Sequence, residues 1–147
     1  MDLSYLFTSF DGRINRKPYW MGVLIMIGAA IVLSIVVGFI IGFTSRAYMI
    51  YSLLLQLGLL YPSAALMAKR LHDRNRPTWW IALILVPSFF QSIASVMGDP
   101  ANPGAIVLGL SLIVFVIGVW FFVELGCLRG TIGPNQYGPD PLEGQQV

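Results

Sequence analysis

The chain has 147 residues, of which 56% are hydrophobic and 11% charged, with a formal net charge of +2 and a mean hydropathy of +0.75. Because soluble domains usually carry about 25% charged residues, this composition excludes an ordinary soluble domain and indicates a protein embedded in a lipid bilayer. The single cysteine, Cys127, excludes an intrachain disulfide and a cysteine-based metal site. Two zinc ligands at helical spacing are absent, so no metal is expected, and no cofactor is expected either.

The first predicted element is a short helix over residues 2–11. Leu3, Leu6, Phe7 and Phe10 repeat at helical spacing and form one apolar stripe, and Gly12 can end the helix. The segment is too short to cross a bilayer. Two placements therefore stay open, because the helix could lie in the membrane interface or pack on the end of the bundle.

Four long apolar segments follow, and each is predicted to cross the membrane as a helix: residues 19–43, 47–68, 79–98 and 105–126. Asn15 precedes the first of them and is placed to cap it. Pro62 and Pro87 predict kinks in the second and third. Four polar side chains share one side of the third span and predict interhelical hydrogen bonds: Ser88, Gln91, Ser92 and Ser95.

The first span carries a ridge of small residues at four-residue spacing, Ala30, Ser34, Gly38 and Gly42. Such a ridge lets a second helix approach closely. Packing inside the monomer is favoured over the alternative, in which the ridge is the face of a homo-oligomer.

Basic residues predict the orientation of the chain. Eight of the nine fall on one side of the predicted spans, and Arg46 alone falls on the other. By the positive-inside bias, both termini are expected in the cytoplasm, together with residues 69–78 and the tail over residues 127–147. The tail is rich in Gly and Pro, so it is expected to be ordered but not helical.

Three polar segments then meet on one membrane face: residues 10–20, 70–80 and 133–141. Each carries part of a pattern, with the residues Gly12, Arg13, Arg16, Tyr19 and Trp20; then Arg70, Leu71, His72, Asp73, Trp79 and Trp80; and finally Gly133, Asn135, Tyr137, Gly138 and Pro141. In order and combination this pattern resembles the bacterial small membrane proteins grouped as domain of unknown function 805. The resemblance implies a location in the bacterial cytoplasmic membrane and brings no assigned activity.

Two departures from that family pattern lie near the second segment. Pro77 and Thr78 stand where Ser-Gly is expected, and Lys69 stands where arginine is frequent. Pro77 stiffens the turn before Trp79, which disfavours a ligand that needs a flexible glycine there.

The candidate site consists of the side chains that these segments bring to one face: Arg13, Arg16, Arg70, His72, Asp73, Arg76, Trp79, Trp80, Asn135, Tyr137 and Asp140. One arginine guanidinium group can donate two parallel hydrogen bonds to phosphate oxygens, so a headgroup or phosphate site is one interpretation. The favoured interpretation is structural, with ion pairs to Asp73, Glu124 or Asp140. Lys17, Lys69 and Arg74 are expected to stay solvated and to set topology only.

His72 invites a general-base interpretation. Adjacent residues on a helix point about 100° apart, so His72 and Asp73 do not form a dyad, and a partner such as Asp11 or Asp140 would be needed. A histidine hydrogen-bonded to the C-terminal segment is favoured. Asn135, Tyr137 and Asp140 are expected to fold back and hydrogen-bond residues 70–80, and Glu124 is expected to pair with an interfacial arginine.

Together these observations predict an all-α fold: one integral membrane domain, a four-helix transmembrane bundle with a short N-terminal interfacial helix and an ordered non-helical tail. The favoured function is noncatalytic, with a cytoplasmic cluster that stabilises the bundle and binds anionic phospholipid headgroups or a partner protein. Two alternatives are an oligomeric small-solute transporter or channel subunit, and a membrane enzyme that acts on a lipid phosphate with His72 as base. No nucleic-acid partner is expected.

Overall fold

The computed structural model describes residues 2–99 and 102–143. The chain begins with α1 (Leu3–Thr8), where the Asp2 carboxylate caps the helix by accepting from the Ser4 N–H at 2.9 Å. The long helix α2 (Arg16–Ile41) is capped as predicted, because the Asn15 side chain accepts from the Lys17 N–H at 3.0 Å. The remaining elements are α3 (Arg46–Asp73), η1 (Thr78–Ile81), α4 (Ala82–Met97), α5 (Ala105–Phe121) and a π-helical turn, η2 (Phe122–Cys127).

The prediction of an all-α, four-helix transmembrane fold is confirmed. Four helical segments are long and apolar enough to cross a membrane: Arg16–Ile41, Arg46–Asp73, Thr78–Met97 and Ala105–Cys127. In the most apolar stretch of α2, 6% of the residues are buried inside the protein. Since large apolar side chains cover the sides of all four helices, a bilayer must solvate them.

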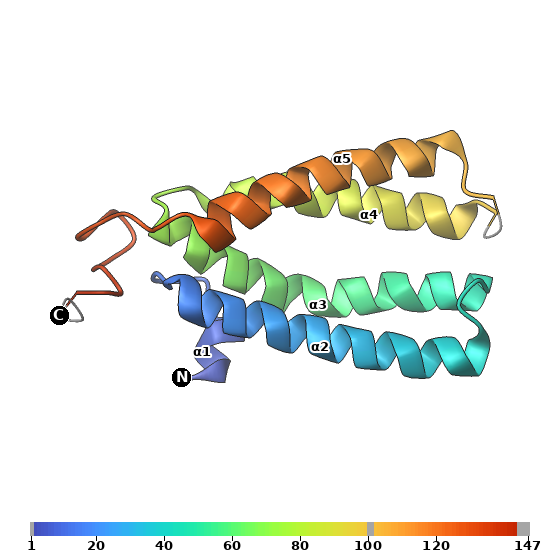
Figure 1. Cartoon of the computed structure of the whole chain (residues 1–147), viewed down its shortest axis with the longest axis horizontal. Coiled ribbons are helices and arrows are strands. Elements are labelled where there is room, and N and C mark those ends of the chain that lie inside the picture. The colour runs from blue at the N-terminus through green and yellow to red at the C-terminus, as the bar shows by residue number, and fades with distance from the viewer. Residues whose placement is uncertain (1, 100–101, 144–147) are drawn as a thin grey trace.

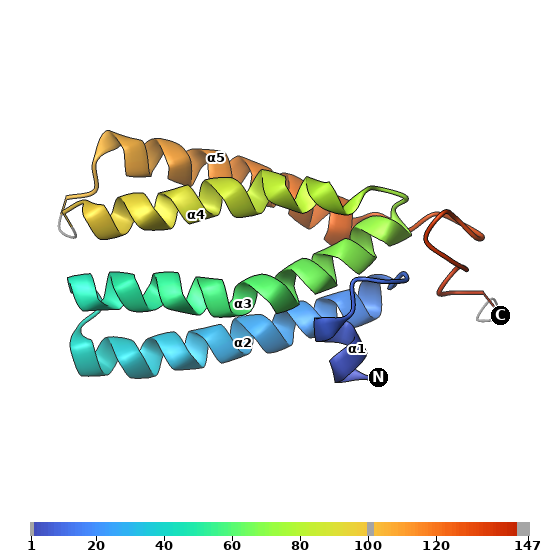
Figure 2. The same ribbon diagram turned by 180° about the vertical axis from the view of Figure 1, so that it is seen from behind.

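The four helices form two antiparallel hairpins, α2 with α3 and α4 with α5 (Figure 1). Both ends of the described chain lie at the same end of the bundle, here called the terminal end, and the opposite end is called the turn end (Figures 1 and 2). The most buried apolar side chains gather at the terminal end, where α1, α3, η1 and η2 meet: Leu6, Ile14, Leu66, Leu71, Ile81, Phe121 and Leu125.

The second span differs from its prediction at its C-terminal end. α3 runs to Asp73, whereas the sequence predicted an end at Ala68. The last five residues, from Lys69 to Asp73, are polar or charged with one exception, yet all five are buried. A hydropathy argument ends the span at the first charge, but here the charges find acceptors inside the protein and the helix continues.

Pro62 lies inside α3, and this helix changes direction along its length (Figure 2). A proline inside a helix removes one hydrogen bond and bends the axis, so the predicted kink has a physical cause. Two of the predicted interhelical hydrogen bonds are present: Ser92 Oγ lies 2.6 Å from Gln56 Oε1 of α3, and Gln91 Nε2 donates to Ser111 Oγ of α5 at 2.7 Å. Ser88 and Ser95 instead donate to carbonyls of their own helix.

The small-residue ridge of α2 lies partly against the monomer itself. Gly38 is buried, and the Phe43 ring occupies the space that a side chain at position 38 would need. Gly42 follows the helix with a positive φ of 82°, a conformation that favours glycine. A homo-oligomer through this ridge stays a prediction.

Candidate functional site

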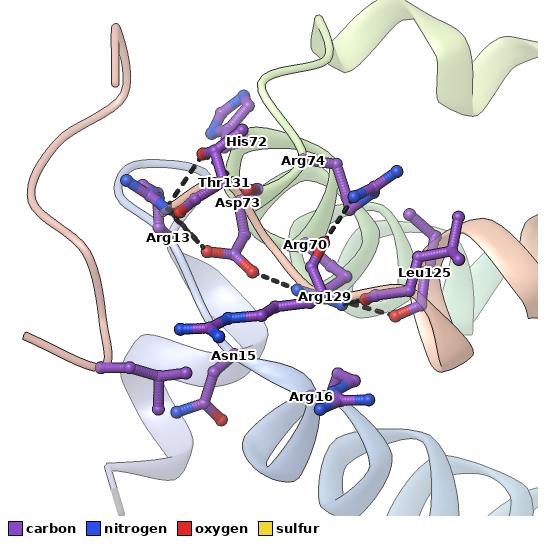
Figure 3. Close-up of polar contacts among 12 residues, drawn as sticks. Arg13, Asn15, Arg16, Arg70, His72, Asp73, Arg74, Leu125, Arg129 and Thr131 are labelled. Carbon is purple, nitrogen blue, oxygen red and sulfur yellow. Dashed lines mark hydrogen bonds and ion pairs between the residues drawn. The ribbon is translucent and has the colours of Figure 1, made fainter. Parts of the chain in front are cut away.

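The site is organised around the buried carboxylate of Asp73, the last residue of α3. Arg13 Nε and Nη2 donate to its Oδ1 at 3.2 and 3.1 Å, and Arg70 Nη1 donates to Oδ2 (Figure 3). The side chains of Arg13, Arg70 and Asp73 are 1%, 0% and 4% exposed. The Asp73 carboxylate thus bridges two guanidinium groups, one from its own helix and one from Arg13, which lies 60 positions before Asp73 in the sequence.

Arg13 has no donor left for another ligand. Its Nη1 donates to the carbonyls of Gly133 and Gly138 at 2.8 and 3.1 Å, and its Nη2 donates to the Thr131 carbonyl at 2.7 Å. With the two bonds to Asp73, all five N–H groups of the guanidinium are used. The positive charge of Arg13 therefore holds the C-terminal tail.

Arg70 connects α3 to η2 in the same way. Its Nε donates to the carbonyl of Leu125 at 2.6 Å, and its Nη2 donates to the carbonyl of Leu128. Leu125 lies in η2 and Leu128 directly follows it. The last carbonyls of a helix lack a partner within it, so one guanidinium binds two carbonyls at this helix end. We call Arg13, Arg70, Asp73 and Thr131 the Asp73 cluster.

The main chain completes this cluster. Thr131 N donates to the Asp73 carbonyl at 2.8 Å, so the tail is tied to the end of α3 by backbone as well as by side chains. Gly130 precedes it, and a Cβ added there would overlap the Asp73 carboxylate. Only glycine fits at this position of close approach.

His72 is also bound to the tail, as predicted, through its main-chain carbonyl and one face of its ring. The hydrogen-bond partners of its two ring nitrogens lie outside the tail and were not predicted. Nδ1 lies 3.2 Å from the Gly12 carbonyl, which can only accept, so Nδ1 carries the proton and Nε2 accepts from Thr78 Oγ1 at 2.7 Å. The Tyr137 ring stacks on the imidazole with centroids 3.9 Å apart and planes 4° apart. Asn135 Nδ2 donates to the His72 carbonyl at 2.9 Å.

The Asp140 side chain makes no hydrogen bond to residues 70–80 within the described part of the chain, so that part of the prediction is wrong. Its carboxylate accepts from the N–H groups of Gly133 and Leu142 at 3.0 and 2.9 Å, within the tail. These hydrogen bonds to the charged form hold the pKa of Asp140 below its usual value, the Leu142 N–H contributing most. Both N–H groups belong to the tail, so the Asp140 carboxylate is bound within its own segment.

Lys69 overturns the expectation that it stays solvated. Its side chain is buried, and Nζ donates to the carbonyls of Tyr5 at 2.6 Å, Leu6 at 2.8 Å and Ser9. The last carbonyls of a helix have no partner within it and carry partial negative charge, so an ammonium is well placed there. Lys69 thereby fixes α1 to α3 and packs α1 on the bundle itself, one of the two placements left open.

Glu124 pairs with arginines, as predicted. Arg74 Nε lies 3.2 Å and Arg76 Nε 3.7 Å from Glu124 Oε1. Arg74 also donates to the Arg129 carbonyl, so it is not simply solvated. The Arg76 guanidinium lies over the Trp80 ring at 4.7 Å from its centroid, a cation–π arrangement.

The groups that remain open to solvent lie beside the Asp73 cluster. Arg16, Lys17 and Arg129 are exposed, and Arg16 has one hydrogen bond, to the Cys127 carbonyl at 3.1 Å. A cavity of about 20 Å³ opens between them, lined by Asn15, Arg16, Arg70, Asp73, Arg129 and Asp140 among others. This volume accommodates about one water molecule and is too small for a phosphate group.

Of the predicted site residues, the structure brings together Arg13, Arg70, His72, Asp73, Asn135 and Tyr137. It places Trp79 elsewhere, in the wall of an apolar cleft between α3 and α4. Sequence reasoning missed Thr131 and the role of Lys69. Among residues 2–99 and 102–143, no three His, Cys, Asp or Glu side chains are close enough to share a metal ion.

The comparisons with known proteins cover nearly the whole chain. The inner membrane proteins YhaI and YhaH of Escherichia coli K12 are 31% and 29% identical to it, over 94% and 92% of this chain and 90% and 88% of their own lengths. A third relative from that strain, the uncharacterized protein YiiR, is 30% identical over 90% of this chain and 85% of its own length.

No solved structure matches this chain. The sequence model of a family described as "Protein of unknown function (DUF805)" matches residues 7–139, which span the Asp73 cluster and all four transmembrane helices. The chain therefore belongs to the DUF805 family of membrane proteins.

Proposed function

We propose that this protein is a noncatalytic component of the bacterial inner membrane, that its terminal end faces the cytoplasm, and that the Asp73 cluster holds the bundle and the tail together there. The names of two relatives, both inner membrane proteins of Escherichia coli, support the location. The basic residues support the orientation, because all but Arg46 lie at or near the terminal end.

One observation carries the structural role: the buried positive charges of the Asp73 cluster and of Lys69 are bound by the protein's own acceptors. Arg13 binds one carboxylate and three tail carbonyls, and Lys69 binds three carbonyls of α1 and the residues after it. A phosphate would have to displace these bonds from groups that are almost fully buried. His72 fits the same role, since both ring nitrogens are hydrogen-bonded and Tyr137 covers one face.

We further propose that the exposed cations beside the cluster bind anionic lipid headgroups. Arg16 and Lys17 open α2. Arg16 and Arg129, both drawn in Figure 3, line the same small cavity. A basic residue near the surface contributes about 1 kcal/mol toward an anionic leaflet. The ligand in this proposal is thus the phosphate of a lipid headgroup, which Arg16, Lys17 and Arg129 contact at the protein surface. The buried Asp73 cluster does not take part in this binding.

Lipid enrichment around the purified protein tests the headgroup proposal. The protein is placed in mixed micelles of phosphatidylglycerol and phosphatidylcholine, and retained lipid is measured after exchange by native mass spectrometry. Arg16→Gln with Arg129→Gln should lower the preference for phosphatidylglycerol, and added salt should lower it further.

Arg46→Gln is the matched control, because Arg46 is also partly exposed but donates to the Gly98 carbonyl at the turn end. It should leave the preference unchanged. An equal loss in the control, or no loss in the double variant, would remove the headgroup proposal. A reporter fused after residue 143 that becomes active outside the cytoplasm would refute the orientation.

A further inference from the structure

Between α3 and α4 lies a cleft of about 580 Å³ that the Asp73 cluster does not use. Four aromatic side chains form much of its wall: Phe10, Trp79, Phe89 and Phe90. Among the described residues that line it, none is charged. Its volume and apolar walls match those of small-molecule sites, which usually add a few polar groups that orient the ligand.

Two polar side chains line this cleft, Thr78 and Gln56, and Thr78 is bonded to His72, which leaves Gln56. Gln56 belongs to α3. It lies ten residues after the start of α3, about 15 Å along a helix, and so close to the middle of a hydrocarbon core that is about 30 Å thick. Its amide contacts Ser92 Oγ at 2.6 Å, and that hydroxyl also lies 3.0 Å from the Ser88 carbonyl.

The Ser92 hydroxyl has one proton, which leaves two arrangements of the Gln56 amide. Either Ser92 donates to Gln56 Oε1, or Ser92 donates to Ser88 and accepts from a flipped Gln56 amide. In both arrangements at least one N–H of Gln56 has no partner among the described residues. An unpaired donor in a hydrocarbon environment is costly, and a ligand with an acceptor oxygen would satisfy it.

We propose that the cleft binds a neutral, membrane-soluble ligand of the quinone class, with one carbonyl oxygen accepting from Gln56 and its planar ring between the aromatic side chains. The absence of charge in the walls selects a neutral ligand. A phospholipid does not fit as well, because its ester carbonyls stay near the membrane surface and its acyl chains offer Gln56 no acceptor. The proposal is independent of the Asp73 cluster and of headgroup binding.

Binding of decylubiquinone to the full chain in lipid nanodiscs tests the proposal, measured as quenching of tryptophan fluorescence, since Trp79 lines the cleft. We expect saturable binding. Gln56→Leu should weaken it about fivefold, the worth of one hydrogen bond, and leaves Ser92 its bond to Ser88. Ala82→Phe fills the cleft from α4 and should abolish binding.

Two variants serve as matched controls. Ser111→Ala removes another polar group inside the bundle, on α5, and should leave the affinity unchanged. Ala30→Phe fills a neighbouring hollow of about 360 Å³, which Gln56 also lines, and should likewise have no effect. Each variant is first checked for an unchanged elution volume and helix content, so that a misfolded protein is not scored as a loss of binding.

Three results would overturn the proposal: no saturable binding, wild-type affinity in folded Gln56→Leu, or loss of binding in folded Ala30→Phe but not in Ala82→Phe. Native mass spectrometry that finds only phospholipid retained in the presence of excess decylubiquinone would assign the cleft to acyl chains instead. A negative result for quinone binding would not affect the lipid-headgroup proposal, because the two experiments use different residues and probes.

Discussion

Asp73→Asn removes the central charge of the Asp73 cluster with little change in shape. The carboxylate is 4% exposed and lies between guanidinium groups that are 1% and 0% exposed, so the variant leaves two buried positive charges without a counter-ion. The new amide N–H₂ group is itself a donor, and it can face the N–H donors of the Arg13 and Arg70 guanidinium groups. Removing one partner of a buried ion pair costs about 3–5 kcal/mol, and the upper part of that range applies here because two pairs are broken.

The assay is thermal unfolding in a mild detergent, followed by intrinsic tryptophan fluorescence. For a chain of this size, each kcal/mol corresponds to about 2–4 °C, so a loss of about 4–5 kcal/mol lowers Tm by about 8–20 °C. Glu143→Gln is the control, because it neutralises an exposed carboxylate in the tail and should change Tm by less than about 2 °C.

A double variant separates the pair from its surroundings. Arg13→Gln with Asp73→Asn removes one of the unpaired charges, so its loss of stability should be smaller than the sum of the two single losses. The reasoning is refuted if Asp73→Asn unfolds at the same temperature as Glu143→Gln, or if the double variant shows fully additive losses.

Three further predictions concern how the tail and α1 are attached. Gly130→Ala should free the tail to limited proteolysis, because the new methyl group overlaps the Asp73 carboxylate, whereas Gly109→Ala, which meets nothing within 4 Å, should not. Lys69→Met should raise hydrogen exchange in α1 and lower Tm, because three carbonyls lose their donor; exposed Lys17→Met should do neither. The tail should lose order as pH falls through the lowered pKa of Asp140, since a depressed pKa stabilises the fold only above it. Asp140→Asn should remove that acid transition in proteolysis, and an unchanged transition would contradict the assignment.

The spans could be predicted from sequence because their signals are local. Charge-free runs of sufficient length, and a cap such as Asn15, depend on nothing beyond a few neighbours, and all four helices follow them. The return of the tail could also be predicted, because the spacing of Asn135 and Tyr137 among Gly and Pro marks a fixed turn. Their contacts with His72 agree with this expectation.

What sequence could not provide is the set of acceptors. Arg13, Lys69 and Arg70 bind mainly main-chain carbonyls, and every residue carries one, so no residue type marks the partner. For the same reason, the buried state of Lys69 and the extension of α3 to Asp73 were missed. From sequence alone, a lysine is expected to be solvated. Its burial can be inferred only once the carbonyls at the end of α1 are known to lie beside it.

The pairing of Arg13 with Gly133 and Gly138 has a consequence for the order of events during synthesis. Arg13 leaves the ribosome before any transmembrane helix, and the two carbonyls leave it after the fourth. The full set of Arg13 hydrogen bonds can therefore form only after residues 133–138 have emerged. In a product cut short before Gly133, Arg13 would keep its bonds to Asp73 and Thr131, but its Nη1 would lack both carbonyl acceptors.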